Sequence, residues 1–216
     1  MFMYRLSYEL LIRLSFAMGG VLMLGLGATI LQEGNVGLDP YTSSNIALAK
    51  VVGLSLGVYQ LIVNLVFLAL IFFIGRKYIG LGTLINMVCV GFLIDFFTGI
   101  FESLNLTATN LFQQVLFLIV GTGIFTLGVA LYTGANLGSA PYDALAPAVV
   151  DHTKASYRMV RIIQDVSFTL LAFFLQGPVG VGTFINAFLT GPLISFWNEK
   201  VAQPLIHTSI AKVKHK

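Results

Sequence analysis

Charged residues are scarce in this chain. Only 10% of its 216 residues are Asp, Glu, Lys or Arg, whereas 57% are hydrophobic; soluble domains have roughly 25% charged and 45–50% apolar residues. A soluble globule of this size needs more charge to cover its surface, which excludes a cytosolic α/β enzyme. The composition is that of a protein that resides in a lipid bilayer.

Further absences exclude several kinds of chemistry. The net charge is only +3 and the basic residues occur singly or in pairs, so no stripe of positive charge could follow a nucleic-acid backbone. The single cysteine, Cys89, excludes disulfide frameworks and cysteine-based metal sites. The sequence contains no P-loop, no His-rich set and no clustered carboxylates or histidines of the kind used by lipid-transferring enzymes. We therefore expect no enzymatic activity, cofactor, metal or nucleic-acid partner.

Long apolar runs divide the chain into membrane spans, since about 20 helical residues cross the roughly 30 Å hydrocarbon core. The clear runs end at a charge, a proline or a glycine-rich turn and are 14–32, 55–75, 110–133 and 158–176. Two further segments, 79–101 and 179–198, carry Asn, Asp or Pro and could be broken or re-entrant instead. The sequence predicts an all-α membrane protein with about six transmembrane helices.

The basic residues predict the orientation, because cytoplasmic loops carry most of the Lys and Arg of membrane proteins. With six spans and a cytoplasmic N-terminus, the outer loops hold only Lys50. The inner segments hold all the other basic residues: Arg5, Arg13, Arg76, Lys77, Lys154, Arg158, Arg161, Lys200, Lys212, Lys214 and Lys216. Both termini are therefore expected in the cytoplasm. A five-span arrangement would place the Lys-rich tail outside and is less favoured.

The chain contains an internal repeat. Asn35-x-Gly37-x-x-Pro40-Tyr41 recurs as Asn136-x-Gly138-x-x-Pro141-Tyr142, and Gly80-x-Gly82-Thr83-x-Ile85-Asn86 recurs as Gly180-x-Gly182-Thr183-x-Ile185-Asn186. Halves of three spans each would enter the membrane from opposite sides, because three is an odd number. Many secondary transporters are built from such inverted repeats, with the site between the halves. The alternative is that duplication only produced a stable helical bundle.

The repeat predicts the following organisation of the chain. The segments are a cytoplasmic N-terminus (1–12), a first three-helix repeat (13–101), an outer linker (102–111), a second three-helix repeat (112–198) and a basic cytoplasmic tail (199–216). The first apolar run matches a later internal helix and lacks a small-residue cleavage site, so we expect it to be a retained span.

Each Asn-x-Gly-x-x-Pro-Tyr motif predicts a helix that ends, turns and restarts. Gly37 would supply the first turn, and Pro40 suits the first position of a helix, where no N–H is needed. The restarted stretches, 40–53 and 141–151, are too short to span, so we expect short interfacial or re-entrant helices. If they dip back into the protein, their N-termini offer a site for an anionic group; otherwise they only connect spans.

Three charged residues share one face of the fifth predicted span, since Arg158, Arg161 and Asp165 are three or four residues apart. An unpaired Asp165 at that depth would cost on the order of 3 kcal/mol, so it needs Arg161 as a partner. In one interpretation the pair is structural and Arg158 reaches the surface. In the other, Arg161 or Arg158 binds a substrate anion, and Asp165 orients it or carries a coupling proton.

The repeat places polar residues of the first half opposite this charged set, because Gln60 and Asn64 are equivalent to Arg161 and Asp165. Asn86 and Asn186 are matched in the third spans, where a hydrogen bond between helices is favoured over a ligand contact. Glycine stripes at Gly20/Gly27 and Gly121/Gly128 predict close helix packing. The candidate substrate-binding residues are Arg161, Asp165, Arg158, Gln60, Asn64, Pro40, Tyr41, Pro141, Tyr142, Asn86 and Asn186.

The repeated motifs resemble those of the YczE/YyaS/YitT-like bacterial integral membrane protein family over nearly the full chain. The resemblance implies a multipass protein of the bacterial plasma membrane, and it implies little chemistry. We expect a secondary transporter or exporter of a small anionic or zwitterionic solute that works by alternating access. The alternatives are a non-transporting scaffold or regulatory protein and a substrate-binding subunit of an energised uptake complex. The expected partners are a small-molecule solute and the lipid bilayer, and a homodimer is left open.

Overall fold

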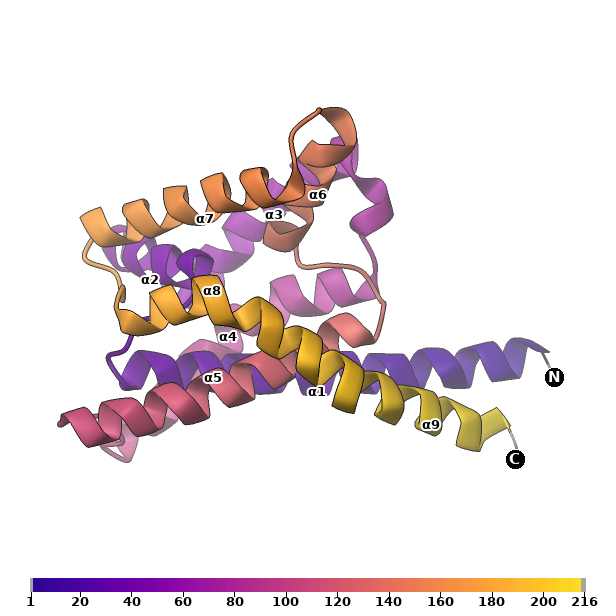
Figure 1. Cartoon of the computed structure of the whole chain (residues 1–216), viewed down its shortest axis with the longest axis horizontal. Helices are drawn as coiled ribbons and strands as arrows, with labels where there is room; N and C mark the ends of the chain where they lie inside the picture. The colour runs from indigo at the N-terminus through magenta and orange to yellow at the C-terminus, as the bar shows by residue number, and fades with distance from the viewer. Residues whose placement is uncertain (1, 215–216) are drawn as a thin grey trace.

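The computed structural model describes residues 2–214, which contain helices and no strand. The helices are α1 (Phe2–Glu33), α2 (Pro40–Val52), α3 (Leu56–Ile74), the 3₁₀ turn η1 (Arg76–Tyr78), α4 (Leu81–Ser103), α5 (Leu111–Gly134), α6 (Pro141–His152), α7 (Tyr157–Phe174), α8 (Val181–Trp197), the π-helical segment η2 (Asn198–Ala202) and α9 (Gln203–Lys214). Both ends of the chain lie at the same end of the molecule (Figure 1). Lys216 lies outside the described residues, as do the side chains of Arg5 and Lys214.

Four helices are long and apolar enough to cross a membrane: residues Tyr8–Glu33 of α1, and all of α3, α4 and α5. The surface is apolar as well, and the side chains of Phe73, Phe112 and Phe188 are each more than three-quarters exposed. A large exposed apolar surface is unfavourable in water and favourable in lipid. The prediction of an all-helical membrane protein is therefore confirmed. Of the other two predicted spans, α7 has 18 residues and α8 has 17.

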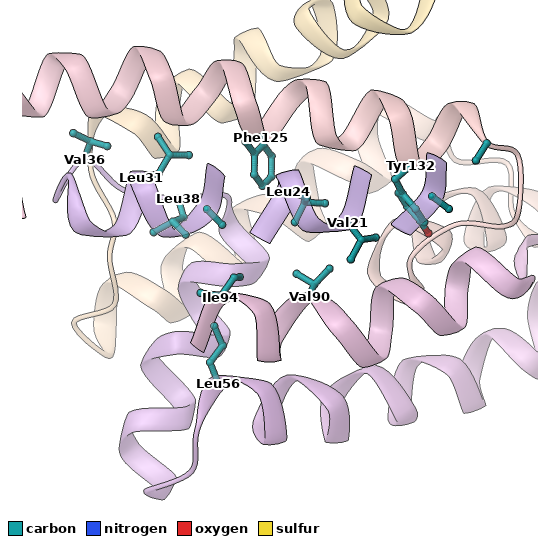
Figure 2. Packing of buried hydrophobic residues seen from close by; sticks show 13 residues of the cluster. Val21, Leu24, Leu31, Val36, Leu38, Leu56, Val90, Ile94, Phe125 and Tyr132 are labelled. Carbon is teal, nitrogen blue, oxygen red and sulfur yellow. The ribbon is translucent and has the colours of Figure 1, made fainter. Parts of the chain in front are cut away.

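The glycine stripes bring α1 and α5 into close contact, as the sequence predicted. A Cβ added to Gly128 would lie 2.5 Å from the backbone nitrogen of Leu24, and one added to Gly27 would lie 2.5 Å from that of Phe125. At these points the two helix backbones are so close that only the hydrogen atom of a glycine side chain fits between them. Figure 2 shows the apolar cluster around this contact, to which α1, α4 and α5 contribute Val21, Leu24, Leu31, Val90, Ile94, Phe125 and Tyr132.

The repeated Asn-x-Gly-x-x-Pro-Tyr motifs form the turns that the sequence predicted. In the first, α1 ends at Glu33, Gly37 has a φ of +91°, and α2 begins at Pro40. In the second, Gly138 has a φ of +102° between the end of α5 and the start of α6. Residues with a side chain adopt these positive φ values at a cost, which explains the glycine at both positions.

Each turn contacts the start of a helix in the other half of the sequence. The backbone nitrogen of Gly182 donates to the oxygen of Val36 at 2.6 Å, and that of Gly82 donates to the oxygen of Leu137 at 2.7 Å. We call these two contacts the linker docks: residues 36–38 on residues 178–182, and residues 137–139 on residues 78–82. A Cβ on Gly37 would overlap the backbone nitrogen of Gly180. The linker docks join the two halves at equivalent positions.

The two ambiguous segments, 79–101 and 179–198, form continuous helices, α4 and α8. Pro192 lies inside α8 without ending it. Beyond α8, η2 leads into α9, which covers residues 203–214 of the predicted tail and packs on α1 and α5. Asp95 in α4 accepts hydrogen bonds from the backbone nitrogens of Leu56 and Gly57. Its carboxylate therefore caps the start of α3.

Candidate functional site

A cavity of about 500 Å³ lies where the N-termini of α2 and α6 approach α3, α4, α7 and α8. This volume is within the range of roughly 300–1,000 Å³ that is usual for small-molecule sites. The apolar part of the lining includes Leu24, Val90 and Phe125 from the central helices. The charged and carboxamide side chains of the lining are Asp39, Gln60, Asn86, Asp143, Arg161, Asp165 and Asn186.

Two tyrosines hold the helix starts together beside this cavity. The rings of Tyr41 and Tyr142 stack with centroids 4.4 Å apart and an interplanar angle of 20°. The Tyr41 hydroxyl donates to Oδ1 of Asn64 at 2.7 Å, and the Tyr142 hydroxyl donates to Oδ1 of Asp165 at 2.8 Å. Equivalent positions of the two halves thus make equivalent bonds, and α2 and α6 meet ring to ring.

Arg161 connects two carboxylates on the second half's side of the cavity. Its Nε donates to Oδ2 of Asp165 at 3.0 Å, and its Nη1 donates to Oδ1 of Asp143 at 2.9 Å. Its guanidinium carbon lies 5.1 Å from the centroid of the Tyr142 ring. The ion pair with Asp165 is the one that helical spacing predicted. The Arg161 side chain is 30% exposed and that of Asp143 46%, so this side of the cavity is accessible.

Sequence reasoning missed two carboxylates of the lining. Asp143 lies in the first turn of α6, where an acidic residue is favoured by the helix dipole. Its position directly after the Pro-Tyr motif is the feature of the sequence that could have identified it. Asp39 precedes Pro40 and caps α2, because its Oδ1 accepts from the backbone nitrogen of Thr42 at 3.0 Å. It also lines the cavity. Its equivalent in the repeat is Ala140, so the two halves differ in charge here.

Three buried carboxamides line the cavity: Gln60, Asn86 and Asn186. The exposed fractions of Gln60, Asn86 and Asn186 are 3%, 7% and 7%. Oε1 of Gln60 and both polar atoms of the Asn186 side chain lack a hydrogen-bond partner among the described residues. The expected hydrogen bonds between helices through Asn86 and Asn186 are absent from the same residues. Since buried polar groups are nearly always satisfied, these amides point to a polar occupant of the cavity.

Three of the predicted site residues do not line the cavity. Asn64 is 1% exposed and lies behind Tyr41, whose hydroxyl it accepts. Pro141 is buried as the first residue of α6. Arg158 is exposed, and no ion pair joins it to another residue of the described chain. Of the two arginines considered for substrate binding, the structure therefore places only Arg161 at the cavity.

A separate ion pair ties the first half to the end of α6. Lys77 Nζ lies 2.9 Å from Oδ2 of Asp151, and the Tyr78 hydroxyl donates to the same oxygen at 2.9 Å. These hydrogen bonds, from Lys77 first and from Tyr78, lower the pKa of Asp151. The pair lies on the surface and has no contact with the cavity lining other than Tyr78.

Comparisons with known proteins agree with the resemblance of the motifs. Residues 11–199 match a family of unknown function, DUF6198. The uncharacterized membrane protein YczE of Bacillus subtilis is 29% identical over 192 residues, covering 88% of this chain and 87% of YczE. An uncharacterized protein of Haemophilus influenzae is 27% identical, covering 91% and 87% of the two chains, and the uncharacterized protein YyaS of Bacillus subtilis is 26% identical, covering 81% and 87%.

No solved structure matches the chain. Each of the three relatives is matched over 87% of its own length. The YczE/YyaS-like identity expected from the motifs is confirmed, and a membrane location is supported by the description of YczE and by the four apolar helices. With its match over residues 11–199, the chain belongs to the DUF6198 family of YczE-like proteins.

Proposed function

We propose that this protein is a secondary transporter or exporter of a small polar solute across the bacterial plasma membrane. The observation that carries the proposal is the polar cavity beside the stacked rings of Tyr41 and Tyr142, where two short helices begin inside a helical membrane protein. Transporters commonly bind their substrates at such helix starts, near the interface of two repeats.

The proposed topology has six crossings, made by α1, α3 and α4 in the first half and by α5, α7 and α8 in the second. At 1.5 Å per residue, the 18 residues of α7 extend roughly 27 Å, which is close to the hydrocarbon thickness. Arg161 and Asp165 of α7 line the cavity, while Ile162, Ile163 and Val166 are exposed. Two inverted three-helix repeats, with both termini cytoplasmic, fit this topology and the distribution of basic residues.

The linker docks suggest how the halves move. Each half holds the helix start of the other through a backbone hydrogen bond, at Gly182 and at Gly82. Rocking of one half against the other would shift both docks and the tyrosine stack together, which is the motion expected for alternating access in an inverted repeat. Tyr157, a lining residue at the start of α7, is exposed, and the proposed topology places this helix start on the cytoplasmic side, so we assign the described conformation to the inward-facing state.

A transport role accounts for the cavity better than a scaffold role does. A scaffold gains nothing from burying Gln60 and Asn186 without partners, because each unpaired polar group costs about 1–3 kcal/mol. A solute that binds reversibly would satisfy these groups in part of the cycle. The proposed partners are therefore the solute and the bilayer, without a requirement for a second protein.

Flux into proteoliposomes tests the proposal. Wild-type protein is compared with Arg161→Gln and with the matched control Arg158→Gln, which changes an exposed arginine on the same helix outside the cavity. The tracers are radiolabelled amino acids, amines and carboxylic acids, supplied under a proton or Na⁺ gradient. We expect saturable uptake by wild type and Arg158→Gln, and a loss of at least about tenfold with Arg161→Gln, as for a removed partner of a buried charge.

Flux is normalised to the amount of folded protein that elutes as a single species in size-exclusion chromatography. If wild-type protein moves none of the tracers under either gradient, the transporter proposal is wrong. Equal flux through Arg161→Gln and wild type would show that the cavity is not the transport site.

A further inference from the structure

We propose that the cavity recognises a protonated amino group of its solute, with Asp39 as the main counter-charge and the buried carboxamides as partners for the solute's other polar groups. This inference rests on the proposed function and deepens it by naming the substrate class. It keeps the zwitterionic solutes expected from the sequence, replaces the purely anionic ones and adds solutes that carry only a positive charge.

The side chains that line the cavity carry more negative than positive charge. Three carboxylates line the cavity, those of Asp39, Asp143 and Asp165, against the single cation of Arg161. The two helix N-termini contribute roughly half a positive charge each. With every carboxylate ionised, the lining still has an excess of negative charge. A simple anion would meet this excess, whereas an ammonium group would reduce it.

Arg161 is already paired with carboxylates of the protein. Its Nε and Nη1 already donate to Asp165 and Asp143. A carboxylate or phosphate could use only the remaining N–H groups of Nη1 and Nη2, and it would bind beside these two carboxylates, whose negative charge repels an anion. Asp39 is in the opposite situation. Its Oδ1 accepts a hydrogen bond from the backbone nitrogen of Thr42, and no ion pair joins it to another described residue. Asp39 is therefore the charge in the lining that lacks a counter-ion.

The carboxylates form one electrostatic group. Burial and the like charges of Asp143 and Asp165 all disfavour the ionised form of Asp39, and a cation that binds beside Asp39 offsets these effects. Tyr41 and Tyr142 also line the cavity, and each ring covers one face of the other. The charge of the lining thus favours a cation.

The unpartnered carboxamides give independent support for a ligand at this place. The Gln60 side chain is 3% exposed with its Oε1 unpaired, and that of Asn186 is 7% exposed with Oδ1 and Nδ2 unpaired. Both line the same cavity as Asp39. Amide oxygens accept from an ammonium group, and an amide nitrogen donates to a carbonyl or carboxylate oxygen. The site can therefore hold both ends of an amino acid or the single charged end of an amine.

Thermal unfolding of the purified protein in detergent tests the inference, because a ligand that binds the folded state raises the melting temperature. The probes share one skeleton and differ in charge: phenethylamine (cation), phenylalanine (zwitterion), phenylacetate (anion) and phenylacetamide (neutral). We expect the amine, the amino acid or both to raise the melting temperature saturably, and phenylacetate and phenylacetamide to leave it unchanged. Stabilisation by phenylacetate, equal stabilisation by the neutral amide, or no stabilisation by either amino compound overturns the inference.

Matched variants place the binding in the cavity. Asp39→Asn keeps an oxygen that can cap α2, because Asn is as good a capping residue as Asp, and removes only the charge. It is expected to weaken binding of the amino compound at least about tenfold. Asp151→Asn removes a surface carboxylate outside the cavity and is expected to leave binding unchanged. Equal binding to Asp39→Asn and wild type would also overturn the inference.

The binding and flux experiments fail in different ways. If the amine binds to wild type but not to Asp39→Asn, and no tracer is transported, the amino-group site is supported and the transport function is wrong. If an anion is transported by wild type but not by Arg161→Gln, and no amine binds, the transport function is supported and the amino-group site is wrong.

Discussion

Arg161 bonds to a carboxylate on its own helix and to another on α6, and these bonds fix the charged side of the cavity. The bond to Asp165 is a local contact between residues four apart, whereas the bond to Asp143 joins α7 to α6. Tyr142 adds a third contact, since its hydroxyl donates to Asp165 and its ring lies near the guanidinium. Loss of the arginine would therefore affect the position of two helices as well as the charge of the lining.

Replacing Arg161 with Gln is expected to lower the free energy of unfolding by about 1–3 kcal/mol. The change leaves Asp143 and Asp165 without their counter-charge, and their partial exposure keeps the loss below that of a fully buried pair. Adding Asp143→Asn and Asp165→Asn should restore most of the loss. Unfolding can be followed through the fluorescence of the single tryptophan, Trp197. Arg158→Gln should change stability by less than about 0.5 kcal/mol, and similar losses for both arginines would contradict the structure.

At the scale of helices, two kinds of close contact organise the molecule: the packing of α1 on α5 through glycines, and the linker docks. Both depend on positions where a side chain has no space. In each case the chain also offers a glycine of similar local conformation that contacts nothing, so the effect of contact can be separated from the effect of backbone conformation.

Gly128→Ala tests the packing of α1 on α5. The new Cβ would lie 2.5 Å from the backbone nitrogen of Leu24, so the helices must separate, at a cost of about 1–3 kcal/mol in unfolding free energy. Gly123→Ala on the same helix is the control. Its Cβ would meet no atom within 4 Å, and alanine improves helix propensity by up to about 1 kcal/mol. Denaturant unfolding in micelles measures both, and equal effects would show that the helices are not in contact at Gly128.

Gly37→Ala tests the first linker dock. Gly37 and Gly53 both have positive φ, +91° and +74°, so an alanine at either position carries a backbone penalty of about 1–3 kcal/mol. Only at Gly37 does the Cβ also overlap the backbone of Gly180, whereas at Gly53 it would meet nothing within 4 Å. We expect Gly37→Ala to lower the melting temperature clearly more than Gly53→Ala does. The dock would be disproved by matching decreases in the two variants.

At the scale of the whole molecule, the proposed six crossings make a prediction for chemical labelling. In a background where Cys89, the only cysteine, is replaced by Ala, single cysteines are placed at exposed positions. Lys50→Cys and Leu106→Cys should react with a membrane-impermeant maleimide in intact cells. Arg76→Cys and Lys154→Cys should react only after the membrane is permeabilised. Labelling of Arg76→Cys in intact cells would contradict the inverted arrangement of the halves.

The helical class, the packing glycines and the helix restarts could be predicted from the sequence, because each depends on local patterns. Gly37 and Pro40 specify a turn and a helix start wherever they occur together. The partners of Asn86 and Asn186 could not be predicted in this way. Whether an amide on a helix face meets another helix or a cavity depends on how the helices are arranged, and the repeat shows which residues are equivalent but not which are in contact.

The charges of the site show the same limit. The pair of Arg161 with Asp165 follows from helical spacing, and the structure contains it. Asp143 joins the site only because α6 lies against α7, which no spacing within one helix reveals. Arg158 lies on the same face of α7 as Arg161. This face is wider than the part of α7 that lines the cavity, so Arg158 lies outside the cavity.

The linker docks also have a consequence for the order in which the protein is made. The first dock joins residues 36–38 to residues 178–182, so the ribosome has produced almost the whole chain before residues 36–38 meet their partners. Until then the carbonyl of Val36 must be satisfied by other groups, whereas the second dock can close as soon as residues 137–139 emerge, because residues 78–82 are already present. The hydrogen bond from Gly182 to Val36 is therefore among the last to form during synthesis, and a nascent chain that stops before residue 178 lacks the first dock altogether.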